Sequence, residues 1–423
     1  MSARHLALFA NRIGQPSLDL NFTAGLLDSR IAFTRASGGT YFDAAAVMQL
    51  AATDVPRFDY DPASLAPRGL LIEESRKNWT RNNANGGASV GTPGVLPTNW
   101  AVQSAISLVT DVAALGTDAG IPYIDLHISG TAAAGSYRLC FETTSGIPGT
   151  NTQPWTTSQY CKLTAGSLAN ITSFSAGYLT FTITPTLIGS RENVVTSPTG
   201  AALATQRIVS TWTNADATSA YVRPSLAFAT PGGAIDLTLR IGMQQMEQAP
   251  FATSAIATAG AAATRAVDVA TMPVGVWFNA AQDTLAVDAM IPAGITASSA
   301  TVVSLDDGTG NNRAQFNALT TGTLLKSVLA SGGVASVVNQ ESNAIVIGTP
   351  FKAALAVAAG LYQTSYNGGN LLTRTASIVV PAGVTRLALG VPIAGNNTLN
   401  GYLSRVRYWP RALSAAQLQQ VTR

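Results

Sequence analysis

The sequence predicts an all-β protein of tandem antiparallel β-sandwiches, with a small N-terminal segment and a short C-terminal helix. Polar and apolar residues alternate along many short segments, and turn formers are abundant, with 38 Gly and 20 Pro among 423 residues. Charged residues make up 11% of the chain and hydrophobic ones 47%. This composition excludes a disordered chain, which lacks apolar residues, and a coiled coil, which is rich in Glu, Lys and Leu.

The net charge of +3 is too small for a chain of this length to attract nucleic acid electrostatically. We expect no membrane insertion, because no segment approaches 18 apolar residues; the run Ala353–Leu361 is among the longest. The apolar run Leu6–Ala10 is too short for a signal-peptide core. We therefore expect synthesis in the cytoplasm without a signal peptide.

Strict alternation marks four strands most clearly. In each strand the apolar residues fall on one face and the polar residues on the other, which is typical of a half-buried strand in an antiparallel sheet. Sheets with one apolar face each pack as sandwiches. The four segments are Tyr123–Ser129, Tyr178–Thr184, Asp236–Met243 and Thr284–Ile291.

The C-terminus carries the signature of one helix. Ser414 is placed as its N-cap, and Gln417 three residues later completes a capping box. Leu413 and Leu418 stand at the positions of a hydrophobic staple. We expect this helix to close the last domain.

Shifts in composition suggest three parts. Residues 1–80 hold a dense cluster of charged and aromatic residues and are expected to form an attachment and oligomerisation segment. Residues 81–265 begin with an Asn/Gly/Pro-rich loop and continue as a first sandwich. Residues 266–423 form a second sandwich, entered through an Ala/Thr-rich crossing.

Four stretches carry a resemblance to a known family. They are LDLNFTAG (18–25) with FTRAS (33–37), PRFDYDP (56–62), PRGLLIEESRKN (67–78) and GYLSRVRYWPRALSAAQL (401–418). Together they resemble virion proteins of tailed phages and prophages, either tail fibres or head spikes. One departure is Lys77-Asn78-Trp79, where family members more often carry Thr-Asn-Leu.

The resemblance extends to the two expected sandwiches. LPTNW (96–100) and MQQMEQAPFATSAI (243–256) resemble the first and last strands of a carbohydrate-binding-module-like, jelly-roll-like domain. DDGTGNNR (306–313) and YWPRALS (408–414) resemble a concanavalin-A-like lectin/glucanase sandwich. The resemblance implies a virion-surface protein made in the host cytoplasm, with portal, head or tail components as partners. It also implies a homo-oligomer, by family analogy a trimer.

Aromatic rings beside amides are the groups that a sugar platform needs. We expect carbohydrate binding at Trp155 and Tyr160, in a polar loop, and at Tyr362, Tyr366, Asn367 and Asn370, in a polar hairpin. The alternative for these aromatic residues is a lid over the end of a sandwich. The neighbours of Trp100, Trp212, Trp277 and Trp409 are apolar, so these four are expected in the core.

Catalytic residues are not expected. Paired carboxylates could hydrolyse glycans, and the candidate pairs are Glu73/Glu74, Asp59/Asp61 and Asp306/Asp307. The C-terminal block lacks the Glu-x-Asp-x-x-Glu string of lectin-like glucanases. Ion pairing with Arg57, Arg68 and Arg76, at a subunit contact, is the preferred interpretation for the first two pairs. His127 is read as a solvated strand histidine beside Asp125.

No cofactor is expected, with one alternative. The turn that holds Asp306, Asp307 and Asn311 could ligate Ca²⁺ through its oxygens, but a plain turn is favoured because Asp, Asn and Gly are common turn formers. Cys140 and Cys161 are expected to be buried free thiols, since a reducing cytoplasm disfavours a bridge.

These observations predict a structural virion protein that displays β-sandwiches for binding host-surface polysaccharide. Two alternatives stay open. The first is a virion glycan depolymerase using Asp306 and Asp307 or Glu73 and Glu74. The second is a purely architectural decoration or joining protein without a ligand.

Overall fold

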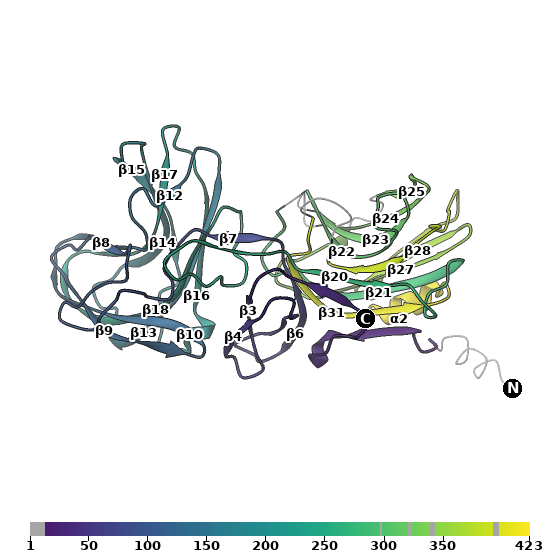
Figure 1. Ribbon diagram of the computed structural model, residues 1–423, viewed down its shortest axis with the longest axis horizontal. Coiled ribbons are helices and arrows are strands. Elements are labelled where there is room, and N and C mark those ends of the chain that lie inside the picture. The colour runs from purple at the N-terminus through teal and green to yellow at the C-terminus, as the bar shows by residue number, and fades with distance from the viewer. Residues whose placement is uncertain (1–12, 297, 320–323, 339–342, 392–396) are drawn as a thin grey trace.

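A computed structural model of the chain describes residues 13–296, 298–319, 324–338, 343–391 and 397–423. Figure 1 shows two β-sandwiches side by side, with the strands β3 and β4 between them. Each pairing among the described strands is antiparallel, as for β10 (Ile121–Ala132) with β18 (Gly233–Glu247). The predicted all-β class with tandem antiparallel sandwiches is confirmed.

The first sandwich stacks two sheets. One sheet has the spatial order β16 (Arg207–Thr213), β13 (Pro154–Gly166), β18, β10 and β9 (Val109–Asp118). The other has the order β15 (Leu187–Val195), β14 (Ser173–Phe181), β17 (Tyr221–Thr230), β11 (Gly135–Cys140) and β8 (Ala101–Ser104), with β12 (Ile147–Pro148) also on β17. The 3₁₀ turn η2 (Leu203–Thr205) precedes β16.

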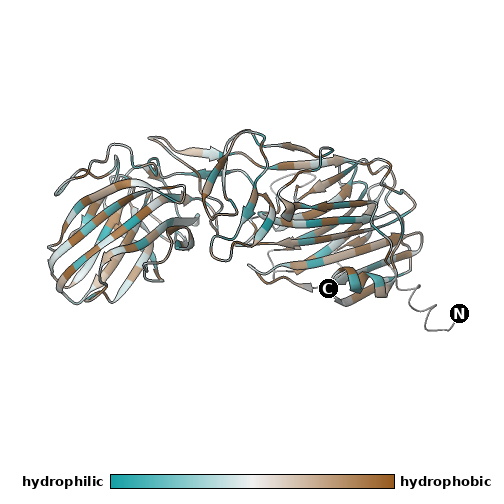
Figure 2. Ribbon diagram, turned by 90° about the horizontal axis from the view of Figure 1, so that it is seen from below, coloured by the Kyte–Doolittle hydropathy of each residue, from teal (hydrophilic) through white to brown (hydrophobic). Residues whose placement is uncertain are grey.

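The core of this sandwich follows from the alternation in the sequence. Ile124, Leu126 and Ile128 of β10 point inward and are buried against Leu237 and Leu239 of β18. Figure 2 shows the resulting change from hydrophobic to hydrophilic residues along these strands. Burying such side chains is the main stabilising contribution to a fold of this kind.

The second sandwich also stacks two sheets. One has the order β29 (Gly369–Arg374), β28 (Leu361–Tyr366), β27 (Phe351–Ala358), β21 (Gln282–Met290), β31 (Gly401–Trp409), β6 (Pro67–Ile72) and β5 (Phe58–Tyr60), with β1 (Leu18–Asn21) also on β31. The other has the order β2 (Ala32–Thr34), β20 (Val269–Pro273), β30 (Arg386–Leu389), β22 (Ser299–Asp306), β23 (Arg313–Leu319), β24 (Leu324–Ser331) and β25 (Val334–Val338), with β26 (Asn343–Ala344) on β24.

Residues 13–80 do not stand apart from this second sandwich. The strands β1 and β6 hydrogen-bond to β31, at the other end of the chain, and β5 continues that sheet. The turn η1 (Phe22–Ala24) buries Phe22 in the same core. Gly69 makes the approach of β6 to β31 close, because its φ is +99° and a Cβ there would lie 2.2 Å from the carbonyl oxygen of Leu403. The N-terminal segment is thus part of the C-terminal sandwich in the structure.

Two small pairings join the sandwiches. The hairpin of β3 (Gly39–Phe42) and β4 (Met48–Ala51) lies between them, and β7 (Arg76–Asn78) pairs with β19 (Ala263–Arg265). Both chain crossings between the sandwiches, before β8 and after β18, therefore lie in one junction.

The predicted C-terminal helix is present as α2 (Ala415–Val421), and both bonds of its capping box form between Ser414 and Gln417. Leu413 and Leu418 are buried in one cluster with Trp409 against the outer face of the sheet. Among the described residues, no helix is long and apolar enough to cross a membrane.

The expectation that strands are wet on one side is wrong in two places. Tyr178 and Thr180 are as buried as Leu179 and Phe181, since both faces of β14 are covered, and β14 ends before Ile183, which is exposed. Ala286 of β21 is buried under α2. Loops and the helix cover faces that alternation alone assigns to solvent.

Candidate functional site

A cavity of about 530 Å³ lies at the junction between the two sandwiches. We call it the junction cleft. It is bounded by the hairpin β3–β4, by β5 and β6, by β13 and β16 of the first sandwich, and by the segment 250–255 that follows β18. Elements from both ends of the chain meet here, since Tyr402 of β31 also lines it.

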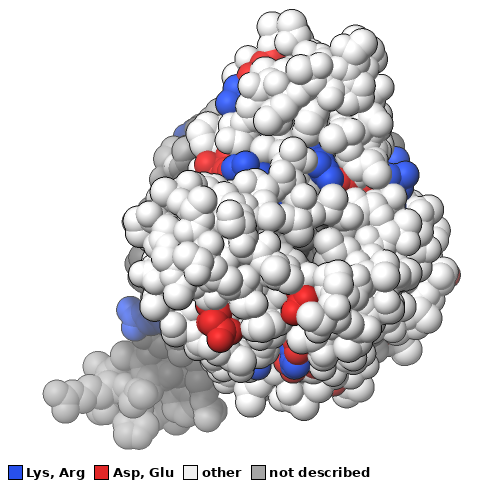
Figure 3. Space-filling view, turned by 90° about the vertical axis from the view of Figure 1, so that its left-hand side faces the viewer, with Lys and Arg blue, Asp and Glu red and all other residues white. Residues whose placement is uncertain are grey.

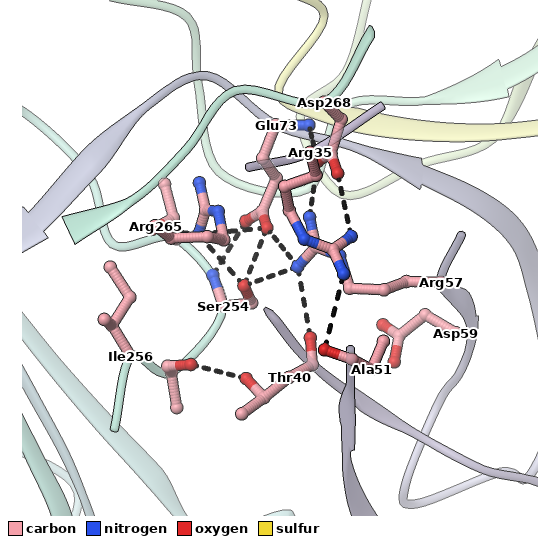
Figure 4. Close-up of polar contacts among 12 residues, drawn as sticks. Arg35, Thr40, Ala51, Arg57, Asp59, Glu73, Ser254, Ile256, Arg265 and Asp268 are labelled. Atoms are coloured by element: carbon pink, nitrogen blue, oxygen red, sulfur yellow. Dashed lines mark hydrogen bonds and ion pairs between the residues drawn. The ribbon is translucent and has the colours of Figure 1, made fainter. Parts of the chain in front are cut away.

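A buried ion network lies beside the cleft and reaches it through Glu73 (Figure 4). Arg57 Nη1 lies 2.7 Å from Glu73 Oε2, and Arg57 Nη2 lies 2.5 Å from Asp268 Oδ2. Arg35 Nη1 is 3.1 Å from Asp268 Oδ1, and Arg265 Nη1 is 3.1 Å from Glu73 Oε2. We call these five residues the junction network. Every member is buried, so each bond acts in a poorly screened environment.

A third buried carboxylate balances the three arginines. Arg265 Nη1 donates to Thr253 Oγ1 over 3.1 Å, and this hydroxyl donates to Glu247 Oε1 over 2.6 Å. Glu247 is completely buried. Three guanidinium groups and three carboxylates thus lie together inside the junction, so the buried charges are balanced.

Glu73 is held ionised. Burial by itself raises the pKa of this carboxyl, but Arg265, Arg57 and two hydrogen bonds from Ser254 outweigh that effect and lower the pKa to about 2. Its Oε1 accepts from the Ser254 backbone N–H, and its Oε2 accepts from the Ser254 hydroxyl, both over 2.7 Å. Glu73 therefore ties the first sandwich to the second.

Another carboxylate, Asp59, lies on the wall of the cleft. Its Oδ2 accepts from the Tyr402 hydroxyl over 2.7 Å, and its Oδ1 accepts from the Phe42 N–H over 2.6 Å. Burial raises the pKa of Asp59, and these two bonds oppose the rise only in part. Burial also raises the pKa of Tyr402 well above its ordinary value.

Arg68 places a partly exposed positive charge at the same wall. Its Nη2 lies 2.5 Å from Asp61 Oδ2, and its Nη1 donates to the Tyr402 hydroxyl over 3.3 Å. The guanidinium also lies 5.3 Å from the centre of the Tyr402 ring. The pair presents a charged group and an aromatic edge to the cavity.

The opposite wall comes from the first sandwich. Arg207 Nη2 donates to Ser158 Oγ over 2.9 Å and to the Thr253 carbonyl over 2.7 Å, while its buried Nε has no partner. Its guanidinium lies 5.8 Å from the centre of the Tyr160 ring. Arg68 and Arg207 therefore line the cleft from opposite sandwiches.

Asn400 contributes an unpaired donor. Its Oδ1 accepts from the Glu74 N–H over 2.9 Å, but its buried Nδ2 has no partner although the residue is only 4% exposed. The backbone of Asn400 is left-handed, with φ +50°. A buried amide without a partner carries a free-energy cost that a ligand acceptor would remove.

The carboxylates of the cleft already accept hydrogen bonds within the protein. A glycosidase needs one carboxyl to give a proton and a second to attack or to activate water. The two carboxyls shift in opposite directions, because the pKa of Asp59 is raised and that of Glu73 is lowered. Each of their four oxygens accepts at least one hydrogen bond from the protein.

The prediction that Trp155 and Tyr160 form an exposed sugar platform in the first sandwich is wrong, because both side chains are buried. Residues 154–166 form the strand β13 rather than a loop, so Trp155 is completely buried among Ile147, Tyr178 and Met246. Tyr160 is also buried, but it packs beside Phe42 at the wall of the junction cleft. Of this pair, only Tyr160 reaches the cavity.

The predicted platform in the second sandwich is likewise buried. Tyr362 lies in the core with its hydroxyl hydrogen-bonded to Ser327, and the Tyr366 hydroxyl donates to the Ala344 carbonyl over 2.9 Å. Asn367 is exposed in the turn between β28 and β29, where its Oδ1 accepts from the Lys352 N–H. Asn370 lies in β29, and its side chain falls outside the described part of the structure.

The tryptophans expected in the core are mostly there. Trp100, Trp277 and Trp409 are buried, whereas Trp212 is 39% exposed. The reason is that Trp212 lies in β16, the edge strand of its sheet, where apolar sequence neighbours do not ensure cover.

The Asp-rich turn is held by its own groups and by Arg386, while the buried Asp306 Oδ2 has no partner. Asp306 is buried and its Oδ1 accepts from Arg386 Nε over 2.6 Å, while Asp307 accepts from Thr309 and Asn312. Asn311 lies at the exposed end of the turn, where its N–H donates to Thr309 Oγ1. Among the described residues no group of three or more His, Cys, Asp or Glu side chains is placed to hold a metal ion.

The ion pairs that the sequence suggested are present, but within one chain. Arg57 pairs with Glu73, Arg68 with Asp61, and Arg76 with Glu74. Asp268, Arg265 and Ser254 were not predicted as site residues, because they lie in the Ala/Thr-rich crossing between the two sandwiches. The sequence signal for this site is that Arg265 and Asp268 are isolated charged residues in a segment that is otherwise apolar.

His127 lies on the outward face of β10, between Asp236 Oδ1 at 3.1 Å and Asp111 Oδ2 at 3.7 Å. Asp125 pairs instead with Arg240, over 2.9 Å. Figure 3 views the molecule from the end of the first sandwich and shows a mostly uncharged surface with scattered acidic and basic groups. This face offers no concentrated charge for a polyanion.

Comparison with known proteins gives no family model that matches the chain and no curated protein that matches it. Solved structures that it resembles include the CBM40 domain of the Ruminococcus gnavus IT-sialidase bound to α2,3-sialyllactose, with 16% identity over 34% of this chain and 83% of that one, TM-score 0.30. Domain 4 of AbnA, a GH43 arabinanase of Geobacillus stearothermophilus in complex with arabinotriose, shows 17% identity over 41% and 81%, TM-score 0.30. Trypanosoma rangeli sialidase with the inhibitor DANA shows 11% identity over 70% and 60%, TM-score 0.29. At these values the likenesses carry no argument about function.

Proposed function

We propose that the protein is a structural component of a phage virion surface, a tail fibre or head spike, and that its junction cleft binds host-surface polysaccharide. The observation that carries the binding site is a cavity of about 530 Å³ held rigid by the junction network. Its walls supply two arginines, Arg68 and Arg207, three tyrosines, and Asn400. Sites for small ligands combine such a cavity with a few fixed polar groups.

The chemistry of the walls suits a saccharide. Sugar hydroxyls both donate and accept hydrogen bonds, and the side chains of Arg68 and Arg207 line the cleft as hydrogen-bond donors. Tyr160 and Tyr402 supply apolar ring surface for the sugar C–H groups. A charged sugar carboxylate would be attracted by Arg68 and Arg207, which face the cleft from opposite sandwiches.

The virion role rests on the resemblance of the terminal segments. The stretches 18–25, 56–62, 67–78 and 401–418 supply β1, β5, β6 and β31, which are neighbours in one sheet. The segments that carry the resemblance therefore lie together in one sheet beside the cleft. A trimer with other virion proteins as partners is part of this proposal, since several copies raise the avidity of one weak site by about 10²–10⁴.

A glycan array with the full-length chain tests the binding site. Arg207→Gln removes a cleft guanidinium, and we expect it to weaken binding at least about 10-fold, which corresponds to about 1.4 kcal/mol. The matched control is Arg405→Gln, which breaks the surface pair with Asp19, over 2.5 Å and away from the cleft. Unfolding temperatures of both variants show whether the fold survives.

The outcomes separate the alternatives. Binding that is lost in Arg207→Gln and kept in Arg405→Gln supports the cleft. If no glycan binds, the architectural alternative takes its place. Release of reducing ends from bound polysaccharide would show a depolymerase and overturn the non-enzymatic proposal.

A further inference from the structure

A second cavity adjoins the junction cleft and differs from it in chemistry. Its volume is about 280 Å³, and its lining is apolar throughout. We call it the apolar pocket. The lining residues are Pro250, Phe251, Ile291, Ala293, Gly294, Ile295, Ala318, Leu319, Ile345 and Ile347.

The two cavities share a wall. Pro250, Phe251 and Ala293 line the apolar pocket and also line the junction cleft. A molecule bound in the cleft therefore lies next to the apolar pocket. Pro250, Phe251 and Ala293 form the boundary that the two cavities share.

The shared wall is firmly placed. The guanidinium of Arg76 lies 4.7 Å from the centre of the Phe251 ring. Arg76 is itself held by Glu74 Oε1 at 2.6 Å and by Thr296 Oγ1 at 2.8 Å. On the other side Gly294 leaves room for the ring, because a Cβ there would lie 3.1 Å from Phe251 Cδ1. The ring is thus packed from both sides.

We infer that the glycan of the cleft carries an apolar substituent, an acyl or alkyl chain, and that this chain occupies the apolar pocket. The inference rests on the proposed function and names the ligand class of the same site. The side chains that line the apolar pocket offer a sugar hydroxyl no hydrogen-bond partner, because each residue is apolar or glycine. Ile347 is 38% exposed at the pocket, so a chain bound there would also remove apolar surface from water.

The test offers each array glycan as its methyl glycoside and as its octyl glycoside to the full-length chain. The octyl form is expected to bind about 10-fold tighter or more, since each buried methylene strengthens binding. Ile347→Glu places a charge in the apolar pocket and should abolish this preference while leaving the methyl glycosides bound. Val346→Glu is the matched control, because the neighbouring Val346 is 64% exposed and does not line the pocket.

The outcomes distinguish this inference from the proposed function. If methyl glycosides bind and octyl glycosides bind no more tightly, the apolar substituent is rejected and the glycan site stands. If Val346→Glu removes the preference as fully as Ile347→Glu, the pocket is rejected as its source. If neither form of any glycan binds, the proposed function itself fails. A preference lost in Ile347→Glu and kept in Arg207→Gln assigns the chain to the apolar pocket.

Discussion

The hydroxyl of Tyr402 donates a hydrogen bond to Asp59 over 2.7 Å, and this bond joins residues that are 343 positions apart in the chain. Tyr402 is the second residue of the strand β31 and Asp59 lies in β5, with β6 between them in the sheet. The contact fixes the wall of the junction cleft, since Asp59 also holds the β3–β4 hairpin through the Phe42 N–H. One side-chain pair thus couples both ends of the sequence to the site.

Tyr402→Phe is expected to destabilise the fold by about 1–3 kcal/mol, because it leaves a buried carboxylate oxygen of Asp59 with Arg68 at 3.7 Å as its nearest charge. Urea unfolding at neutral pH measures the loss. Tyr41→Phe, at a half-buried tyrosine of the same cleft, controls for the removal of a hydroxyl and should cost less. An equal loss in both variants would contradict a special role for the Asp59 bond.

Glu73→Gln is expected to cost about 3–5 kcal/mol at pH 7, because it removes the carboxylate that pairs with the buried Arg265 and leaves the buried Arg57 with Asp268 alone. The pKa of Glu73 is lowered from 4.5 to about 2 in the folded chain, so its stabilisation is complete above about pH 4.5 and is lost as the pH falls toward 2. The difference in unfolding free energy between the two proteins should therefore shrink between pH 5 and pH 3.

Asp28→Asn is the control for Glu73→Gln. The pKa of Asp28 also falls to about 2, chiefly through its hydrogen bond from Arg30, but this pair is open to solvent, with 48% of the Arg30 side chain exposed. Solvent screening should limit the loss to about 1 kcal/mol or less. A loss as large as that of Glu73→Gln would mean that burial of the junction network adds nothing.

The strands and the helix could be predicted because their causes are local. The alternation of Ile124, Leu126 and Ile128, and the capping box at Ser414, determine their elements whatever lies around them. The cover on the outer faces could not be predicted in the same way. Thr180 and Ala286 look solvent-facing in the sequence, and it is distant loops and α2 that bury them.

The candidate site escaped sequence reasoning for a related reason. The junction network beside the cleft joins Arg35, Arg57, Glu73, Arg265 and Asp268, and the Arg35–Asp268 pair spans 233 positions. Local spacing correctly paired Arg57 with the nearby carboxylates but could not reach across the chain. The polar neighbours of Trp155 predict a loop, but this Thr- and Ser-rich segment forms the buried strand β13. Trp155 is therefore buried and cannot serve as a sugar platform.

Cys140 and Cys161 are expected to resist thiol reagents in the folded protein. They lie in different sheets, on β11 and β13, and both are completely buried free thiols. Burial raises the pKa of Cys140 to about 11 and that of Cys161 to about 12, so little reactive thiolate exists at pH 8. Titration with a chromogenic disulfide should find both thiols in urea and neither, over minutes, in buffer. Rapid reaction of the native protein would contradict this burial.

Asp283→Asn is expected to stabilise the fold at alkaline pH. Burial raises the pKa of Asp283 from 3.8 to about 7, and its buried Oδ1 has no hydrogen-bond partner. The unfolded chain releases this proton above about pH 4, whereas the folded chain keeps it until about pH 7. Folding stability contributed by this group therefore falls as the pH rises from 4 to 7, by on the order of 2–4 kcal/mol.

Urea unfolding at pH 4 and pH 8 should give nearly equal stabilities for the two proteins at pH 4 and a more stable variant at pH 8. Asp236→Asn, whose side chain is 81% exposed, controls for the loss of one negative charge, and an equal gain in that variant would assign the effect to net charge rather than to the buried carboxyl.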